Sequence, residues 1–282
     1  MNYGKKSTKK RASQLTGKRT KAKKKFGVAF WKSLFVGILI IIAIAAIAAA
    51  IYVTRLIQQC PDISTVDISP EGYLTTVLDS DGNEIETLAS SGANREYVTL
   101  DEIPVNLQHA FVAIEDERFY THNGVDIRGM IRAGVTAVMT GFRETQGAST
   151  ITQQLAKNQY FTQEQTVERK IAEVFMALTM EQHFSKRTIL ELYVNSIYFG
   201  DGYEGIGSAS WGYFGKAPSA LDADECTLLA GIPNAPSVYA LSQNPGLARE
   251  RQQEVLRKLV SYDYLGQDAA QHILGNLRAL AA

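Results

Sequence analysis

Residues 115 to 124 read EDERFYTHNG and follow directly on an apolar stretch, Ala110 to Ile114. The apolar residues before the charges have helical spacing, so a core-facing helix is predicted to end at Glu115. A carboxylate in that position is partly buried, and burial raises its pKa, as does the like charge of Asp116 beside it. A carboxyl group with a raised pKa is a better proton acceptor near neutral pH, so Glu115 is a candidate general base. A solvated helix end with Arg118 as ion-pair partner is the alternative.

Other residues of this stretch have structural interpretations of their own. Phe119 and Tyr120 are typical of a core or a lid, and His122 of a local hydrogen-bonding partner. Gly124 is typical of a turn, because glycine tolerates backbone angles that other residues avoid.

A second stretch, GASTITQQLAKN at residues 147 to 158, predicts a helix with one polar face. Four residues share that face at i, i+3, i+4 and i+7: Thr150, Gln153, Gln154 and Lys157. Ser149 or Thr150 is expected to cap the helix. Hydroxyls and amides with a single cation suit a sugar or a phosphate. The alternative is an exposed polar face, which usually carries pairs of Glu and Lys.

A third stretch, VERKIAEVFMAL at residues 167 to 178, sets a second carboxylate among cations. Arg169, Lys170 and Glu173 lie within one helical turn, away from the apolar stripe. The functional interpretation is a carboxylate held beside two positive charges. The structural alternative is an i,i+4 ion pair of Arg169 with Glu173, which adds only about 0.2–0.5 kcal/mol when it is exposed.

Two further stretches are rich in aromatic residues, glycine or proline. Residues 186 to 216 combine several glycines with Tyr193, Asn195, Tyr198, Phe199, Tyr203, Trp211, Tyr213 and Phe214. Such aromatic residues usually belong to a core, but interleaved with Gly and Asn they also suit carbohydrate stacking. The last stretch, LLAGIPNAPSVY at residues 228 to 239, ends a helix near Gly231 and is interpreted as architecture.

Charge is distributed unevenly along the 282 residues, although the formal net charge is zero. Residues 1 to 32 hold twelve Lys or Arg and no acid, leaving seventeen bases against twenty-nine acids in the remainder. Ser33 to Thr54 follows with no charge and no proline. At about 1.5 Å per residue this segment spans the roughly 30 Å hydrocarbon layer, which predicts a transmembrane helix.

The basic flank places the N-terminus of that helix in the cytoplasm, because positive residues are retained on that side. A cleaved secretion signal is the alternative, but its apolar region has about 7 to 15 residues. The basic tail could also bind nucleic acid or anionic lipid, although topology alone explains its sign.

The remainder of the chain is predicted to be mainly helical. A linker rich in Ser, Asp and Pro covers 58 to 71, and two short β runs flank a turn at 80 to 83, the pattern of a hairpin. Helices are predicted at 104–116, 126–139, 149–159, 166–184, 186–197, 203–213, 221–231, 245–260 and, with a less regular pattern, 267–279. Residues 140 to 148 are expected to form a mobile loop, either a gate or clamp or an ordinary surface loop.

Several common sites have no support in the sequence. Cys60 and Cys226 are the only cysteines and do not suggest a disulfide framework. No HExxH, CxxC or phosphate-loop pattern occurs.

The five stretches, in this order, resemble the family 51 glycosyltransferases. These are the peptidoglycan glycosyltransferases, found alone or as the first module of class A penicillin-binding proteins. The shared patterns run from Glu115 to Tyr239: ED..F..H.G, G.STITQQ..KN, RK..E, K..ILE.Y.N..YFG and LLAG.P.AP..Y. Five collinear matches make the resemblance specific. Position 194 is Val where the family often has Leu, a departure that is expected to be harmless.

The resemblance implies a mainly α fold, with a lysozyme-like helical domain and a small membrane-proximal jaw. To these the sequence adds the short β-hairpin and the N-terminal transmembrane helix. The expected organisation is a basic cytoplasmic tail (1–32), a transmembrane anchor (33–54), a linker (55–74), the glycosyltransferase domain (75–265) and a C-terminal helical tail (266–282).

The resemblance also implies a reaction. Glu115 would remove the proton from the 4-hydroxyl of lipid II, which attacks the anomeric carbon of the growing lipid-linked glycan with inversion and release of undecaprenyl pyrophosphate. Glu173 would assist near the leaving group or orient it. The remaining expected substrate contacts are Asp116, Phe119, His122, Gly124, Ser149, Thr150, Gln153, Gln154, Lys157, Asn158, Arg169, Lys170, Tyr193, Asn195, Tyr198 and Gly200.

The expected partners are lipid II, the growing lipid-linked glycan, the membrane and proteins of cell-wall synthesis or division, with no nucleic acid. The resemblance allows a divalent cation, Mg²⁺ or Mn²⁺, without requiring one, and the sequence shows no complete ligand set. The catalytic domain is expected outside the cytoplasm on a single-pass anchor. STKK and SQN match transpeptidase motifs only superficially and no KTG occurs, so a single-function enzyme or a piece of a longer protein is expected.

Two alternatives compete with this function. A lysozyme-like muramidase or lytic transglycosylase also uses carboxylates on a helical fold, but it has no need of cations beside the second glutamate. A membrane-tethered scaffold without catalytic activity is the other alternative.

Overall fold

The computed structural model describes residues 5–58, 60, 75–78, 84–88, 95–141, 147, 149–161 and 166–280. The chain divides into two compact units, Met1–Gln59 and Cys60–Ala282, which are described separately. Most of the predicted linker, the hairpin turn and residues 142 to 146 of the predicted mobile loop lie outside the described residues.

The first unit consists of one helix, α1 (Lys5–Ile57). Its segment Val28–Ile57 has a mean hydropathy of 3.1 and is long and apolar enough to cross a membrane. The predicted span, residues 33 to 54, lies inside this segment. The helix also continues through the basic residues, so the boundary between tail and anchor is one of composition and not of secondary structure.

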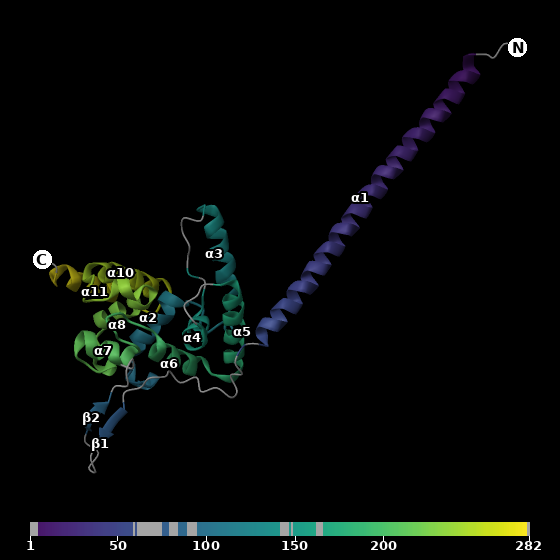
Figure 1. The fold of residues 1–282 in the computed structure, drawn as a ribbon. Coiled ribbons are helices and arrows are strands. Elements are labelled where there is room, and N and C mark those ends of the chain that lie inside the picture. The colour runs from purple at the N-terminus through teal and green to yellow at the C-terminus, as the bar shows by residue number, and fades with distance from the viewer. Residues whose placement is uncertain are drawn as a thin grey trace. The chain divides into compact units, whose positions relative to one another are not determined.

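The second unit is mainly helical, as predicted (Figure 1). Each predicted helix is present, with ends within three residues of those expected: α2 (Val105–Glu115), α3 (Ile127–Met139), α4 (Ile151–Tyr160), α5 (Val167–His183), α6 (Lys186–Ser196), α7 (Ile206–Phe214), α8 (Ala223–Gly231), α10 (Pro245–Ser261) and α11 (Gln267–Leu280). Four short elements were not predicted: η1 (Leu100–Glu102), η2 (Pro218–Ala220), η3 (Ile232–Asn234) and α9 (Pro236–Tyr239).

The predicted hairpin is confirmed as two antiparallel strands, β1 (Thr75–Leu78) and β2 (Glu84–Leu88). Thr75 pairs with Leu88, and the register shifts between Val77 and Leu78. β1 and β2 form the one sheet found among the described residues.

Helix α2 is the centre of the core. Leu107, Ala110, Phe111 and Val112 are fully buried, and α2 packs against α8 and α10. Phe111 meets Tyr193 of α6 edge to edge with ring centroids 6.2 Å apart. Helix α4 packs between α5 and α6. Because α2 runs through the core, its last residue emerges where the α4 and α10 sides of the domain meet.

Candidate active site

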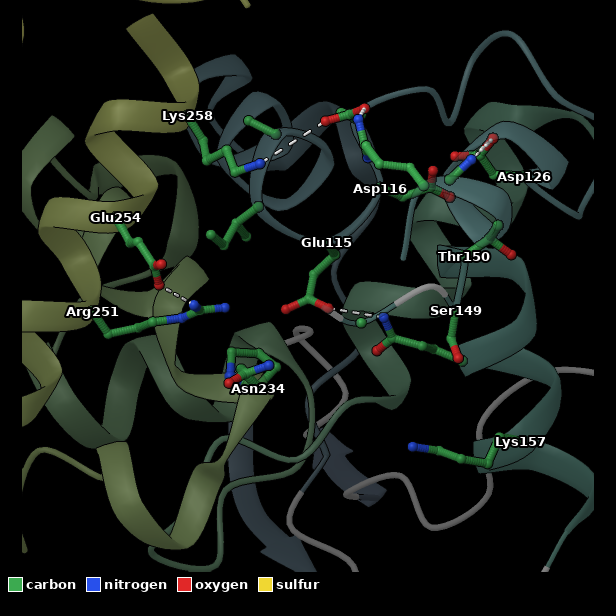
Figure 2. Close-up of a pocket in the computed structure, with 18 residues that line it drawn as sticks. Glu115, Asp116, Asp126, Ser149, Thr150, Lys157, Asn234, Arg251, Glu254 and Lys258 are labelled. Carbon is green, nitrogen blue, oxygen red and sulfur yellow. Dashed lines mark hydrogen bonds and ion pairs between the residues drawn. The ribbon is translucent and has the colours of Figure 1, made fainter. Parts of the chain in front are cut away.

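A cavity of about 560 Å³ lies at the carboxyl end of α2. Its walls come from residues 113 to 117, the start of α3, the first half of α4, η3 and one face of α10. Figure 2 shows the Glu115 side chain at its centre, with Arg251 and Asn234 on one side and Ser149 and Lys157 on the other. Segments more than 130 residues apart in the sequence therefore build one site.

Glu115 is the last residue of α2 and turns its carboxylate into the cavity. Gln154 Nε2 donates a hydrogen bond to Glu115 Oε2 over 2.8 Å. The other oxygen, Oε1, is buried and has no hydrogen-bond partner among the described residues. A buried acceptor without a donor is costly unless a ligand completes it, so Oε1 is the atom available to take a proton.

Burial raises the pKa of Glu115, and the like charge of Asp116 adds to the rise. The hydrogen bond from Gln154 and the charges of Arg251 and Lys157 oppose it. This confirms the predicted raised pKa. The alternative of a solvated helix end paired with Arg118 is wrong, because Arg118 pairs with Glu117 and Asp126 instead.

Asp116 has a positioning role inside the protein. Its side chain is buried, and Oδ2 accepts a hydrogen bond from the backbone N–H of Ile151, the first residue of α4, over 3.0 Å. His122 Nε2 lies 2.9 Å from Oδ1, so His122 is the local hydrogen-bonding partner that the sequence predicted. Asp116 thereby fixes the start of α4 against the end of α2.

The cap of α4 divides the predicted polar face. Thr150 is the N-cap, accepts from the backbone N–H of Gln153 and donates to the carbonyl of Gly124 over 2.6 Å. Gln153 accepts from the backbone N–H of Thr150 in a capping box and is only 1% exposed. Thr150, Gln154 and Lys157 line the cavity, whereas Gln153 is turned into the cap and does not.

Gly124 holds the other end of this cap. Its φ is +85°, and a Cβ there would lie 2.6 Å from the carbonyl oxygen of Ala177. Glycine is required for both reasons. Its backbone conformation aims its own carbonyl at Thr150.

Lys157 is the cavity cation with the fewest internal commitments. It lines the cavity and makes no hydrogen bond or ion pair with the part of the chain that the structure describes. Its positive charge is therefore available to an anionic ligand.

Glu173 lies outside the cavity lining and is 2% exposed. Arg169 Nε lies 2.9 Å from one of its oxygens and Lys170 Nζ 3.0 Å from the other. Lys170 Nζ also donates to Ser149 Oγ over 2.7 Å, and Ser149 does line the cavity. The predicted ion pair with Arg169 is confirmed, and the group reaches the cavity wall through Lys170 and Ser149.

Of the remaining predicted contacts, Tyr193 and Asn195 have internal partners. Tyr193 is fully buried, and its hydroxyl donates to Gln154 Oε1 over 3.3 Å. Asn195 Oδ1 accepts from the N–H of Val98, and Asn195 Nδ2 donates to the Val98 carbonyl. These bonds fix the segment before η1 to α6. Their assignment as substrate contacts stays a prediction.

The other predicted residues outside the cavity lie elsewhere in the domain. Phe119 is fully buried, with Lys186 Nζ 4.4 Å from its ring centroid. Tyr198 accepts a hydrogen bond from the Gly202 N–H, and Asn158 is exposed. Gly200 has a φ of +83° and lies tightly against α9 and Ala240. The predicted contacts absent from the lining are Phe119, His122, Gly124, Gln153, Asn158, Arg169, Lys170, Tyr193, Asn195, Tyr198 and Gly200.

Sequence reasoning missed the α10 wall. Arg251, Glu254 and Lys258 line the cavity from one face of α10, and Asn234 lines it from η3. Glu117 lines its outer end and pairs with Arg132 and Arg118, each over 2.7 Å. In sequence, α10 resembles any charged surface helix. Only its i, i+3, i+7 spacing of charges could have indicated a shared face.

The residues that the structure describes contain no group of three or more His, Cys, Asp or Glu arranged to hold a metal ion. In the cavity, the Asp116 carboxylate is taken up by Ile151 and His122. A ligand set for the expected Mg²⁺ or Mn²⁺ is therefore not found among them, and no chemical step below involves a metal.

A buried carboxylate with one free oxygen, close to an uncommitted cation, defines a group-transfer site with an anionic leaving group. Residues 81–260 match the family model described as Transglycosylase. The chain belongs to this family, the peptidoglycan glycosyltransferases that its motifs resemble.

Three relatives illustrate the match. Penicillin-binding protein 1A of Escherichia coli K12 is 41% identical over 83% of this chain and 28% of its own length. Penicillin-binding protein 1A of Clostridium perfringens strain 13 is 38% identical over 85% of this chain and 36% of its own. A transglycosylase-named protein of Cupriavidus necator is 43% identical over 62% of this chain and 75% of its own. The chain thus spans about a third of the length of the penicillin-binding proteins that it matches.

Proposed function

We propose that this chain polymerises peptidoglycan strands from lipid II. The carrying observation is the free, buried Oε1 of Glu115 in a cavity that it shares with Lys157. Glu115 takes the proton of the 4-hydroxyl of the incoming lipid II as that oxygen attacks the anomeric carbon of the growing glycan. The new C1–O4 bond forms with inversion, and the bond from C1 to the lipid pyrophosphate breaks.

The leaving pyrophosphate gains negative charge in the transition state, so fixed cations favour the reaction. Lys157 supplies one charge directly from the cavity wall. Lys170 lies behind Ser149 on the same wall and is bonded to it. Glu173 holds Arg169 and Lys170 in place from a buried position, and its role here is to orient the cations that meet the leaving group.

A lipid-linked substrate requires that the site lie close to a bilayer. Helix α1 supplies an apolar segment of the necessary length. The catalytic unit has a second apolar surface on α3, where Ile127, Ile131, Val135 and Val138 are each more than half exposed. Their spacing of i, i+4, i+8 and i+11 places them on one face of that helix. This face is the proposed membrane-proximal jaw.

The orientation follows from the charges beside the apolar segment. Twelve bases and no acid precede it, so the N-terminus stays in the cytoplasm and the catalytic unit lies outside. Association with cell-wall synthesis or division proteins stays a prediction, as does a divalent cation.

The test is incubation of the purified full chain in detergent or vesicles with lipid II. Glycan polymer and free undecaprenyl pyrophosphate are expected, and Glu115→Gln should form neither. Shortened wall glycan without polymer would favour a muramidase or lytic transglycosylase instead. No turnover on either substrate by a folded, membrane-inserted protein would leave the scaffold as the better explanation.

A further inference from the structure

The α10 wall of the cavity carries an arginine that the proposed chemistry has not used. Arg251 lines the cavity and its side chain is 14% exposed. Its Nη1 pairs with Glu254 Oε2, one turn further along the same helix. Its Nε is buried and has no hydrogen-bond partner among the described residues.

Arg251 and Glu115 face each other across the cavity. Figure 2 shows the guanidinium, tethered by Glu254, extending toward the Glu115 carboxylate from the side opposite Gln154. Gln154 engages Oε2, which leaves Oε1 as the free oxygen. Two buried polar atoms without partners, Glu115 Oε1 and Arg251 Nε, thus line one cavity.

The electrostatics agree with this geometry. A positive charge near a buried carboxylate favours its ionised form. Of the two cations that lower the pKa of Glu115, Arg251 contributes more than Lys157. Lys258, on the same face of α10, is instead close to Glu117.

We propose that Arg251, held by Glu254, is a positioning residue for the general base: it keeps Glu115 ionised and its free oxygen turned toward the substrate hydroxyl. This inference rests on the proposed function, because it assigns Arg251 a task in the same reaction. Arg251 acts through Glu115, and the bond-making step is unchanged.

The test compares pH profiles of kcat/KM on lipid II for the full chain and three variants. Arg251→Gln removes the charge, so Glu115 takes up a proton at higher pH. The acidic limb should therefore move up by roughly one pH unit, with activity about 3- to 10-fold lower on that limb and recovering at high pH. Arg251→Lys keeps the charge and should leave the limb within a few tenths of a unit of wild type. Arg257→Gln, which neutralises an exposed arginine of the same helix, should match wild type.

A structural role for Arg251 would give a different pattern. Both Arg251 variants would then lose activity at every pH, with the limb in its wild-type place, and that result would overturn the inference. If Arg251→Gln does not fold, Arg251→Lys and Glu254→Gln still test it. Because Glu254 acts through Arg251, the effects of Glu254→Gln and Arg251→Gln should be non-additive, and additive effects would count against the tether.

Failure of the inference can be told apart from failure of the proposed function. If wild type makes no polymer, the proposed function fails. Titration of the Glu115 carboxyl by difference infrared spectroscopy, with Glu115→Gln to assign the band, then still tests Arg251 without any substrate. If wild type polymerises lipid II and neither the limb nor the carboxyl band moves in Arg251→Gln, the inference alone is wrong.

Discussion

Gln154 of α4 donates a hydrogen bond to Glu115, the last residue of α2, over 2.8 Å. Tyr193 donates in turn to the carbonyl oxygen of the Gln154 amide over 3.3 Å. That second bond sets which end of the amide faces the carboxylate. The base is thus held by two helices that belong to different stretches of the sequence, and one of its oxygens is left free for the reaction.

Glu115→Gln removes the proton acceptor but keeps the shape of the side chain. We expect polymerisation to fall by about 10²- to 10⁴-fold, the usual contribution of a general base. Product formation from lipid II measures the effect. The matched control is Glu250→Gln, which neutralises an exposed carboxylate of α10 and should leave turnover unchanged. Retention of wild-type turnover in Glu115→Gln would remove Glu115 from the mechanism.

The same substitution should stabilise the protein at alkaline pH. Burial raises the pKa of Glu115 in the folded state, so the folded chain binds more protons than the unfolded chain between the two pKa values. Stability conferred by this group therefore falls as pH rises above the ordinary glutamate pKa of about 4.3. Thermal unfolding of Glu115→Gln should occur roughly 2–4 °C above wild type at pH 8, with the difference vanishing near pH 4. A lower melting temperature of the variant at pH 8 would contradict this.

Lys157→Gln removes the cavity cation that has no partner within the described residues. If this charge stabilises the departing pyrophosphate, kcat should fall by about 10²-fold, with a smaller change in KM. Lys157→Arg keeps the charge and should recover part of the loss. Release of undecaprenyl pyrophosphate in a single turnover is the measurement. Equal release rates for Lys157→Gln and wild type would assign the leaving-group charge to other residues.

Asn195→Ala tests whether that residue is structural. Its side chain bonds both the N–H and the carbonyl of Val98 in a buried setting. Leaving these groups without partners should cost about 2–4 kcal/mol of unfolding free energy, measured by thermal or denaturant unfolding. Asn158→Ala, at an exposed position, should change stability by less than about 0.5 kcal/mol. Unaltered stability of Asn195→Ala together with a raised KM would return Asn195 to the substrate contacts.

The sequence by itself determined the helices and the base. Apolar residues at helical spacing placed α2 and α4 to α6 correctly, because one side of each helix must be buried whatever its neighbours are. The charges directly after the apolar end of α2 also indicated a partly buried Glu115, and its pKa is raised as predicted. The cap at Thr150 followed from local chemistry in the same way.

Only the tertiary structure decided which residues share the cavity. Packing of α10 against α2 and α8 brings Arg251 to the side of Glu115, and no local pattern encodes a contact between residues 136 positions apart. Packing also turned Gln153 into the helix cap and Asn195 onto the Val98 backbone, although both share motifs with cavity residues or their partners. Spacing along a helix fixes the face of a side chain, but the neighbours packed on that face determine whether the side chain meets substrate or protein.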